Sequence, residues 1–263
     1  MIVGMQERFL AAYDDQLRGV TEVHDAADVQ RLGPLWLARL FGNRGFITYR
    51  ALPTDAAEIE RLVGAALAYF RDDTDVTGVE WKTRQHDDAP GLVAALEARG
   101  FVAEEPESIM IGEAAALNVE VPLPEGVEIR RIASVEDIWA AAEMQGRVFD
   151  DPLWRTRAEQ TEQRMLVDDG QEFWIATAGG EVISAGRLEP VPGADFAGIW
   201  GGATVPQWRG RGIYRALTAR RAAVALSLGK TFIHSDSTDF SRPILERSGF
   251  VRVSSTTPYV WTR

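Results

Sequence analysis

One stretch of the sequence alternates glycine and arginine directly before a predicted helix. It runs Gln207-Trp208-Arg209-Gly210-Arg211-Gly212 and follows the apolar, strand-like segment GIWGGATV. Backbone N–H groups at a helix N-terminus bind anions, and glycine lets a ligand approach the backbone without a Cβ in the way. Arginines add charge-assisted hydrogen bonds to phosphate oxygens. The spacing therefore predicts a phosphate-binding loop, followed by a helix over about residues 210–228.

Other ligand-binding patterns do not fit this sequence. A Walker loop requires G-x-x-x-x-G-K-[ST], which is absent, and a dinucleotide fingerprint requires glycine where Arg215 stands. The chain has no cysteine, and its three histidines, His24, His86 and His234, lie far apart. We therefore expect no metal site and no acyl-cysteine intermediate.

The elements that would position the loop can be followed from residue 127 onward. Ser134, with Asp137 three residues later, is a capping-box-like helix start, and Gly179-Gly180 joins two β-rich runs as a hairpin. The last segment, FVRVSSTTPYVWT, is either a strand pair or one long bent strand. The element order β α α β β β α β α β predicts a mixed α/β sheet.

The N-terminal part repeats the later half of this pattern. LEARGFV at 96–102 matches LERSGFV at 245–251 with a constant offset of 149 residues. The match indicates an internal duplication, although a common helix end followed by a strand would give the same similarity. Prolines and a glycine then mark a linker. We predict a domain over 1–120, a linker over 121–126 and a second domain over 127–263.

The extended segment ATVPQWRGRGIYRAL resembles the acyl-CoA pyrophosphate loop, Q/R-x-x-G-x-G/A, of the GNAT superfamily of N-acetyltransferases. The resemblance covers about residues 127–263 in both motif and element order. It implies the GNAT acyl-CoA N-acyltransferase fold for this part and a smaller, partial GNAT-like domain before it. It also implies acetyl-CoA as the co-substrate, without a metal.

The resemblance also assigns residues to the acetyl-CoA site. Gly201-Gly202 interrupts a strand, which favours a bulge, and in the resembled family pantetheine pairs with that bulged strand. Ser241 stays a candidate for a polar contact with the cofactor arm. The predicted cofactor-binding residues are Ala203, Thr204, Val205, Arg209, Gly210, Arg211, Gly212, Ile213, Tyr214 and Ser241.

The catalytic positions depart from the family pattern. The tyrosine that protonates the leaving thiolate in many relatives is replaced by Leu245, and the usual strand carboxylate by Phe196. We predict Asp236 as the general base, because it lies just past a strand end next to the predicted acyl site. His234, Glu189 and a base reached through water stay open as alternatives.

The predicted function is therefore an N-acetyltransferase acting on a primary amine of a small-molecule or peptide acceptor, by direct attack in a ternary complex. The alternative is a non-catalytic acyl-CoA-binding or regulatory module, motivated by the two substituted positions. The N-terminal part has no glycine loop where its helix begins, at LPTDAAEIERL. We expect it to bind no CoA.

The charge and composition of the chain restrict its partners. The net charge is -11, and residues 1–120 carry 21 acidic and 11 basic side chains, against 18 and 17 in the remainder. A nucleic-acid partner is disfavoured by this balance. No apolar run is long enough to span a membrane, and MIVGMQERFL has no secretory signal pattern. We expect a cytoplasmic protein; no feature indicates an oligomeric state.

Overall fold

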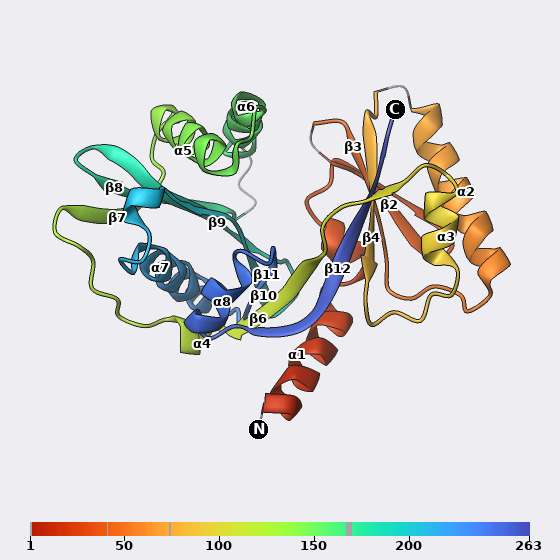
Figure 1. Cartoon of the computed structure of the whole chain (residues 1–263), viewed down its shortest axis with the longest axis horizontal. Coiled ribbons are helices and arrows are strands. Elements are labelled where there is room, and N and C mark those ends of the chain that lie inside the picture. The colour runs from red at the N-terminus through yellow and green to blue at the C-terminus, as the bar shows by residue number, and fades with distance from the viewer. Residues whose placement is uncertain (1, 41, 74, 167–169) are drawn as a thin grey trace. The chain divides into compact units, whose positions relative to one another are not determined.

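The computed structural model of the chain describes residues 2–40, 42–73, 75–166 and 170–263. Contacts between Cα atoms divide the chain into two compact units. The N-terminal unit contains Met1–Met110, Asp236–Ile244 and Val251–Arg263, and the C-terminal unit contains Ile111–Ser235 and Leu245–Phe250. Each unit combines a sheet with helices, as the α/β prediction requires (Figure 1).

The N-terminal unit is built on a sheet with the strand order β1-β2-β3-β4-β12. β3 and β4 run parallel with α2 between them in sequence, and the other neighbours in this order are antiparallel. Its strands are β1 (Asp28–Leu32), β2 (Leu35–Leu40), β3 (Arg44–Tyr49), β4 (Gly78–Arg84), β5 (Val102–Ala103), the start of β6 (Glu107–Glu113), and β12 (Val251–Thr262). Its helices are α1 (Ile2–Gln16), η1 (Gly19–Val23), α2 (Ala56–Asp72) and α3 (Leu92–Glu97).

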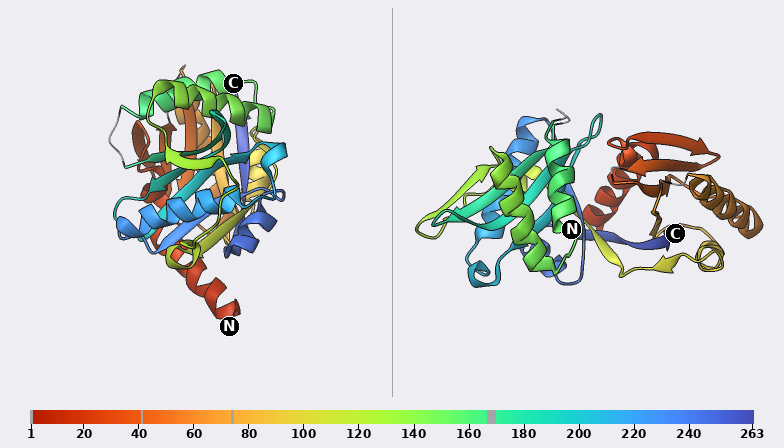
Figure 2. Two further views of the ribbon diagram at one scale, coloured as in Figure 1. Left: turned by 90° about the vertical axis from the view of Figure 1, so that its left-hand side faces the viewer. Right: turned by 90° about the horizontal axis from the view of Figure 1, so that it is seen from above.

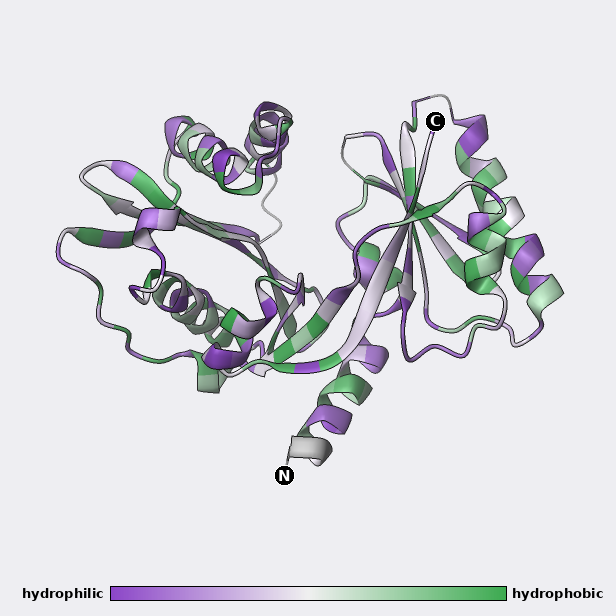
Figure 3. Cartoon of the chain, in the orientation of Figure 1, coloured by the Kyte–Doolittle hydropathy of each residue, from purple (hydrophilic) through white to green (hydrophobic). Residues whose placement is uncertain are grey.

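The helix α2 shows how the sequence builds this core. The Asp55 side chain caps its first turn by accepting a hydrogen bond of 2.8 Å from the Glu58 N–H. Its buried side chains recur at helical spacing and include Ile59, Val63 and Phe70. They pack in one cluster with buried residues of the strands and of α3. Figure 3 shows the resulting mixture of hydrophobic and hydrophilic positions along α2.

The C-terminal unit is built on a sheet with the strand order β11-β10-β9-β8-β7. β10 and β11 run parallel, whereas the other neighbours are antiparallel, so this sheet is mixed as predicted. Its strands are β7 (Val127–Arg131), β8 (Glu172–Ala178), β9 (Glu181–Pro190), β10 (Phe196–Thr204) and most of β11 (Phe232–Ser237). Its helices are α4 (Ala114–Leu117), α5 (Val135–Phe149), α6 (Trp154–Arg164), η2 (Pro206–Trp208), α7 (Ile213–Ser227) and part of α8 (Arg242–Ser248).

Helices cover both faces of the strands of the C-terminal unit. Figures 1 and 2 show α5 and α6 on one face and α7 on the other. The predicted start of α5 is confirmed, because the Ser134 hydroxyl accepts a hydrogen bond from the Asp137 N–H at 3.3 Å. The predicted hairpin is also confirmed: β8 and β9 pair across Gly179-Gly180, both with positive φ.

The last strand belongs, by its contacts, to the N-terminal unit. FVRVSSTTPYVWT forms one long strand, β12, which pairs with β4 and β5 of the N-terminal unit. Contacts therefore group Val251–Arg263 and Asp236–Ile244 with residues 1–110 and not with the rest of 127–263. Strand pairing between residues far apart in sequence leaves no local signal, which is why sequence reasoning placed the boundary differently.

The two similar helix ends have the same local geometry. In α3, Phe101 N–H donates to Leu96 O at 3.1 Å, and in α8, Phe250 N–H donates to Leu245 O at 3.1 Å. The glycine that follows each helix, Gly100 or Gly249, has positive φ. This is a helix ending closed by a left-handed residue, for which glycine is favoured. The shared geometry agrees with a duplication, and equally with a common way of ending a helix.

Candidate functional site

The glycine loop lies between β10 and α7, as predicted. After η2, Gly210 has φ of +74° and Gly212, the N-cap residue of α7, has φ of +81°. Both values lie in the left-handed region, where a residue with a Cβ is strained. No side chain caps the first turn of α7. The N–H groups of that turn are therefore oriented as in an anion-binding helix start.

The arginines of the loop fix its shape and supply positive charge. Arg209 Nε donates to the Thr204 carbonyl at 2.9 Å, which ties the loop to the end of β10. The Arg211 guanidinium lies over the Trp208 ring, 4.8 Å from its centroid. A Cβ added to Gly210 would meet no atom within 4 Å. The loop thus presents open backbone beside two guanidinium groups, which suits a pyrophosphate.

The strand before the loop contains the predicted bulge. The register between β10 and β9 shifts between Trp200 and Ala203, and Gly201 has φ of +61°. Gly202 is also required by packing, because a Cβ there would lie 2.5 Å from the Tyr214 ring. A bulge bends its strand, and bulges are frequent at sheet edges and next to active sites.

β10 separates from β11 after Gly198, just before the bulge. Their parallel pairing covers Phe196 to Gly198 and extends no further among the described residues. The Ser235 hydroxyl donates to Ile199 O at 3.0 Å, and the Ser184 hydroxyl to Ala203 O at 2.6 Å. The edge of β10 that faces β11 therefore lacks a strand partner where Ala203 and Thr204 lie, and an extended ligand can pair with such an edge.

The first turn of α7 packs against this strand. The Ile213 side chain is buried, and the Tyr214 ring fills the space beneath Gly202. Arg221 lies about two turns further along α7. It is fully buried, and its guanidinium is 5.9 Å from the Tyr214 ring centroid. Burial lowers the pKa of Arg221. The predicted residues Ile213 and Tyr214 thus lie in the buried first turn of α7, and Tyr214 packs against the bulge at Gly202.

Two of the predicted residues belong, by their contacts, to the N-terminal unit. Asp236 Oδ2 accepts a hydrogen bond of 2.6 Å from Lys82 Nζ, and both side chains are largely buried. Ser241 exchanges hydrogen bonds with the hydroxyls of Ser237 and Thr238. The Asp236 carboxylate is thus engaged in a buried ion pair with Lys82. The prediction of Asp236 as general base therefore finds no support in this geometry.

A different titratable side chain lies beside the bulge. The Trp200 indole covers Gly198, because a Cβ on Gly198 would be 2.5 Å from the indole Nε1. His234 of β11 is in register with Gly198, and its ring meets the Trp200 indole edge-on with centroids 5.3 Å apart. His234, one of the alternatives left open by the sequence, therefore lies on the same face of the sheet as Trp200.

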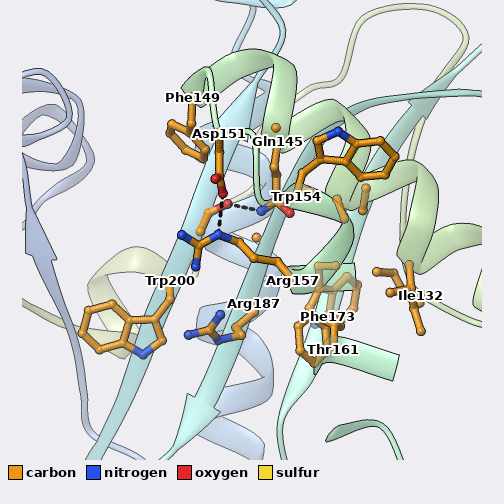
Figure 4. Close-up of a pocket in the computed structure, with 18 residues that line it drawn as sticks. Ile132, Gln145, Phe149, Asp151, Trp154, Arg157, Thr161, Phe173, Arg187 and Trp200 are labelled. Carbon is orange, nitrogen blue, oxygen red and sulfur yellow. Dashed lines mark hydrogen bonds and ion pairs between the residues drawn. The ribbon is translucent and has the colours of Figure 1, made fainter. Parts of the chain in front are cut away.

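A pocket of about 440 Å³ opens on that face. Figure 4 shows it between α5 and α6 on one side and the strands on the other, with Trp200 at its edge. Gln145 Nε2 donates to the Gly201 carbonyl at 2.6 Å, so the bulge itself forms part of the wall. The volume is in the usual range for a small-molecule site.

Five polar residues of this pocket were missed by sequence reasoning. They are Gln145 and Asp151 from the end of α5 and the turn after it, Arg157 and Thr161 from α6, and Arg187 from β9. Asp151 forms an ion pair with Arg157, which with the Leu153 N–H holds the pKa of that carboxyl below its usual value. Arg187 pairs with Glu189 at 2.5 Å. The only available signal was the turn-forming run Asp150-Asp151-Pro152, which predicts a loop and no partner.

The corresponding position of the N-terminal unit is filled by side chains. β3 and β4 also stop pairing partway, after Ile47 and Trp81. Beyond that point Glu22 accepts from Arg84 at 2.5 Å and from Lys82 at 2.9 Å. Burial raises the pKa of Glu22, but the two cations outweigh burial and lower it to about 2. Glu22 thus connects β3, through Thr48, with β4, through Arg84, where the pairing of the two strands has ended.

Two kinds of feature are absent from the described residues. No group of three or more histidine, aspartate or glutamate side chains in the described ranges is arranged to hold a metal ion. Within the same ranges, no helix has both the length and the apolar composition needed to cross a membrane.

Comparison with known proteins agrees with the geometry. Residues 130–250 match the model of the acetyltransferase (GNAT) family. The GCN5-related N-acetyltransferase from Kribbella flavida superposes with a TM-score of 0.70 at 17% identity, over 96% of this chain and 94% of that chain. No curated protein sequence matches the chain.

Two further structures share the fold. A tandem GNAT protein from the clavulanic acid biosynthesis pathway has a TM-score of 0.61 at 14% identity, over 88% of this chain and 81% of that chain. A GCN5-related N-acetyltransferase from Sphaerobacter thermophilus has a TM-score of 0.59 at 15% identity, over 87% and 76%. At such identities the likeness concerns the fold. The family match places residues 130–250 in the acetyltransferase (GNAT) family.

Proposed function

We propose that the C-terminal unit transfers an acetyl group from acetyl-CoA to a primary amine of a small-molecule or peptide acceptor. One observation carries the proposal. The bulge at Gly201 lines the pocket on one side, and the same strand leads directly into the glycine loop at Gly210 and Gly212. The proposed donor site and the proposed acceptor site would thus meet at the bulge of β10.

The residues of the donor site fit an acyl-CoA. The open backbone at Gly210 and Gly212, with Arg209 and Arg211, would hold the pyrophosphate at the start of α7. The segment from Ala203 to Val205 would lie along the pantetheine arm at the edge that β11 leaves. Ile213 and Tyr214 would support this arm from beneath the strand.

The reaction exchanges one bond for another. Acetyl-CoA supplies the acetyl group, so that a C–N bond forms at the carbonyl carbon as the C–S bond breaks and the thiolate leaves. The backbone of the bulge would polarise the carbonyl, since fixed N–H groups stabilise developing negative charge. The amine loses a proton to a base in the protein, and we propose His234 for this role.

His234→Ala is expected to lower kcat by about 100-fold or more, the usual contribution of general acid–base catalysis. The dissociation constant of acetyl-CoA should stay unchanged, because His234 is not part of the loop. His24→Ala is the matched control, since His24 is exposed and bonds only its own turn at Thr21 O. A His234→Ala variant with wild-type kcat would exclude His234 as the base.

Release of free thiol from acetyl-CoA tests the activity itself. The full chain is mixed with acetyl-CoA and separate amines, including amino acids, peptides, polyamines and aminoglycosides. We expect thiol release that depends on the amine, with an N-acetylated product found by mass spectrometry. Tight binding of acetyl-CoA without turnover of any amine would instead favour a non-catalytic acyl-CoA-binding module, consistent with Leu245 and Phe196 at the usual catalytic positions.

The N-terminal unit is proposed to bind no CoA. The support is the ion network of Glu22, Lys82 and Arg84, in which Glu22 connects β3 and β4 where their pairing has ended. The helix that connects β3 and β4, α2, is capped at its N-terminus by the Asp55 carboxylate. This negative charge would repel a phosphate. This unit then has a supporting role in the chain.

A further inference from the structure

The pocket beside the bulge has several flat aromatic side chains in its lining. Five of them surround it: Phe149, Trp154, Phe173, Trp174 and Trp200. Trp154 is held in place because Gly146 leaves room for it, a Cβ there being 2.6 Å from the Trp154 Cβ, and because Trp139 packs edge-on at 6.2 Å. Aromatic walls of this kind favour a flat apolar ligand.

Two arginines enter the same pocket from different elements. Figure 4 shows Arg157 coming from α6 and Arg187 from β9. Each is paired with one carboxylate through its Nε: Arg157 with Asp151, and Arg187 with Glu189. Among the described residues, neither guanidinium has a hydrogen-bond partner for its two Nη groups. The pairing thus orients both guanidiniums and leaves donors for a ligand.

The charge of the lining selects the sign of that ligand. Of the charged side chains that line the pocket, Arg157 and Arg187 are positive and Asp151 is negative. The partner of Arg187, Glu189, does not line the pocket, so the lining itself carries one net positive charge. Paired Nη groups of arginine bind a carboxylate in a bidentate manner. A polycationic amine would meet two guanidiniums and a single carboxylate that is already paired.

Size sets the last condition. About 440 Å³ accommodates one aromatic ring with a short chain, and it is small for a folded partner. The amine must reach the bulge, where Gln145 holds Gly201, while the carboxylate reaches the arginines. An aromatic amino acid has its amine and its carboxylate on one carbon, next to the ring-bearing group.

We infer that the acceptor is a primary amine that also carries a carboxylate and an aromatic body, as in an aromatic amino acid, and that Arg157 and Arg187 bind its carboxylate. The inference rests on the proposed acetyl transfer for its chemistry. The binding of such a ligand, however, can be measured without turnover.

The test uses matched acids and amides. Phenylalanine, tyrosine and tryptophan are each compared with the corresponding amide, and spermidine serves as a cationic amine. Thiol release gives kcat/KM, and quenching of the pocket tryptophans gives the dissociation constant in the presence of CoA. We expect each acid to exceed its amide by about tenfold or more in both measurements, the usual value of a charged hydrogen bond.

Arg187→Met should remove this preference while leaving the affinity for the amide within about twofold, since the amide needs no cation. Arg131→Met is the control. Arg131 is exposed and paired with Glu172, and it does not line the pocket. The control should keep the preference of the native chain for acids.

The outcomes separate the two proposals. If acetyl-CoA does not bind, or no amine is acetylated although acids bind tightly, the proposed function fails and the pocket assignment stands. If amides or spermidine bind or react as well as the acids, or if no aromatic acid binds at millimolar concentration, the inference is overturned whatever the turnover. Retention of the preference for acids in Arg187→Met also overturns it.

Discussion

Gly210→Glu is expected to weaken acetyl-CoA binding by at least about 100-fold, while the chain stays folded. The loop backbone at Gly210 is open, with no atom within 4 Å of an added Cβ, so the substitution has room in the protein. The carboxylate would enter the proposed pyrophosphate position at the start of α7, where like charges repel. A factor of 100 corresponds to about 2.7 kcal/mol, which is a modest demand for a repelled phosphate.

Gly229→Glu is the matched control for this substitution. Gly229 follows α7 at its other end, has the same φ of +74°, and also has no atom within 4 Å of an added Cβ. The two variants should therefore share the conformational cost of about 1–2 kcal/mol. Calorimetric titration is expected to give one CoA per chain for the native protein and for Gly229→Glu. Equal affinity in a folded Gly210→Glu variant would rule out this loop as the cofactor site.

Glu22→Gln is expected to destabilise the N-terminal unit by about 3–5 kcal/mol, the usual cost of leaving a buried cation without its partner. Glu22 accepts from Arg84 and Lys82, and also from the Thr48 hydroxyl. Arg84 is 4 % exposed as a residue, so water cannot replace the lost carboxylate. Hydrogen exchange of the β4 amides, followed by mass spectrometry, measures the effect in this unit directly.

Glu60→Gln is the control for Glu22→Gln, and the pH dependence of stability gives a second test. Glu60→Gln removes an exposed partner of Arg99 at 3.4 Å and should cost less than about 1 kcal/mol. The pKa of Glu22 is about 2 in the folded chain against an ordinary value of 4.5. Its contribution is thus complete above pH 4.5 and declines as the pH falls toward 2. Glu22→Gln should lack this part of the acid sensitivity, and a variant no less stable than Glu60→Gln would contradict the role of the network.

Features with a local cause were predicted from the sequence. Gly201-Gly202 produced the bulge, Ser134 capped its helix, and the glycine loop took the conformation that its residues favour. Each of these features depends on the backbone conformation that a few neighbouring residues prefer, and that preference can be predicted from the local sequence.

Features that depend on distant partners were not predicted. Lys82 and Asp236 form an ion pair although they are 154 residues apart in sequence, so an acid expected to act as a base is occupied in the structure. Arg157 and Arg187 come from a helix and a strand, and only the packing of α6 over the sheet brings them to one pocket. The spacing of such residues carries no signal, because their proximity follows from strand order and helix packing.

The placement of β12 has a consequence for how the chain is made. β4 is translated before residue 85, yet the strand that pairs with it, β12, ends at Thr262. During synthesis the edge of β4 that pairs with β12 therefore stays unpaired until the C-terminal unit has left the ribosome. Unpaired strand edges promote aggregation. The N-terminal unit thus leaves the ribosome first but completes its sheet last. A stop codon before residue 251 would remove β12 and leave β4 of the N-terminal unit without this strand partner.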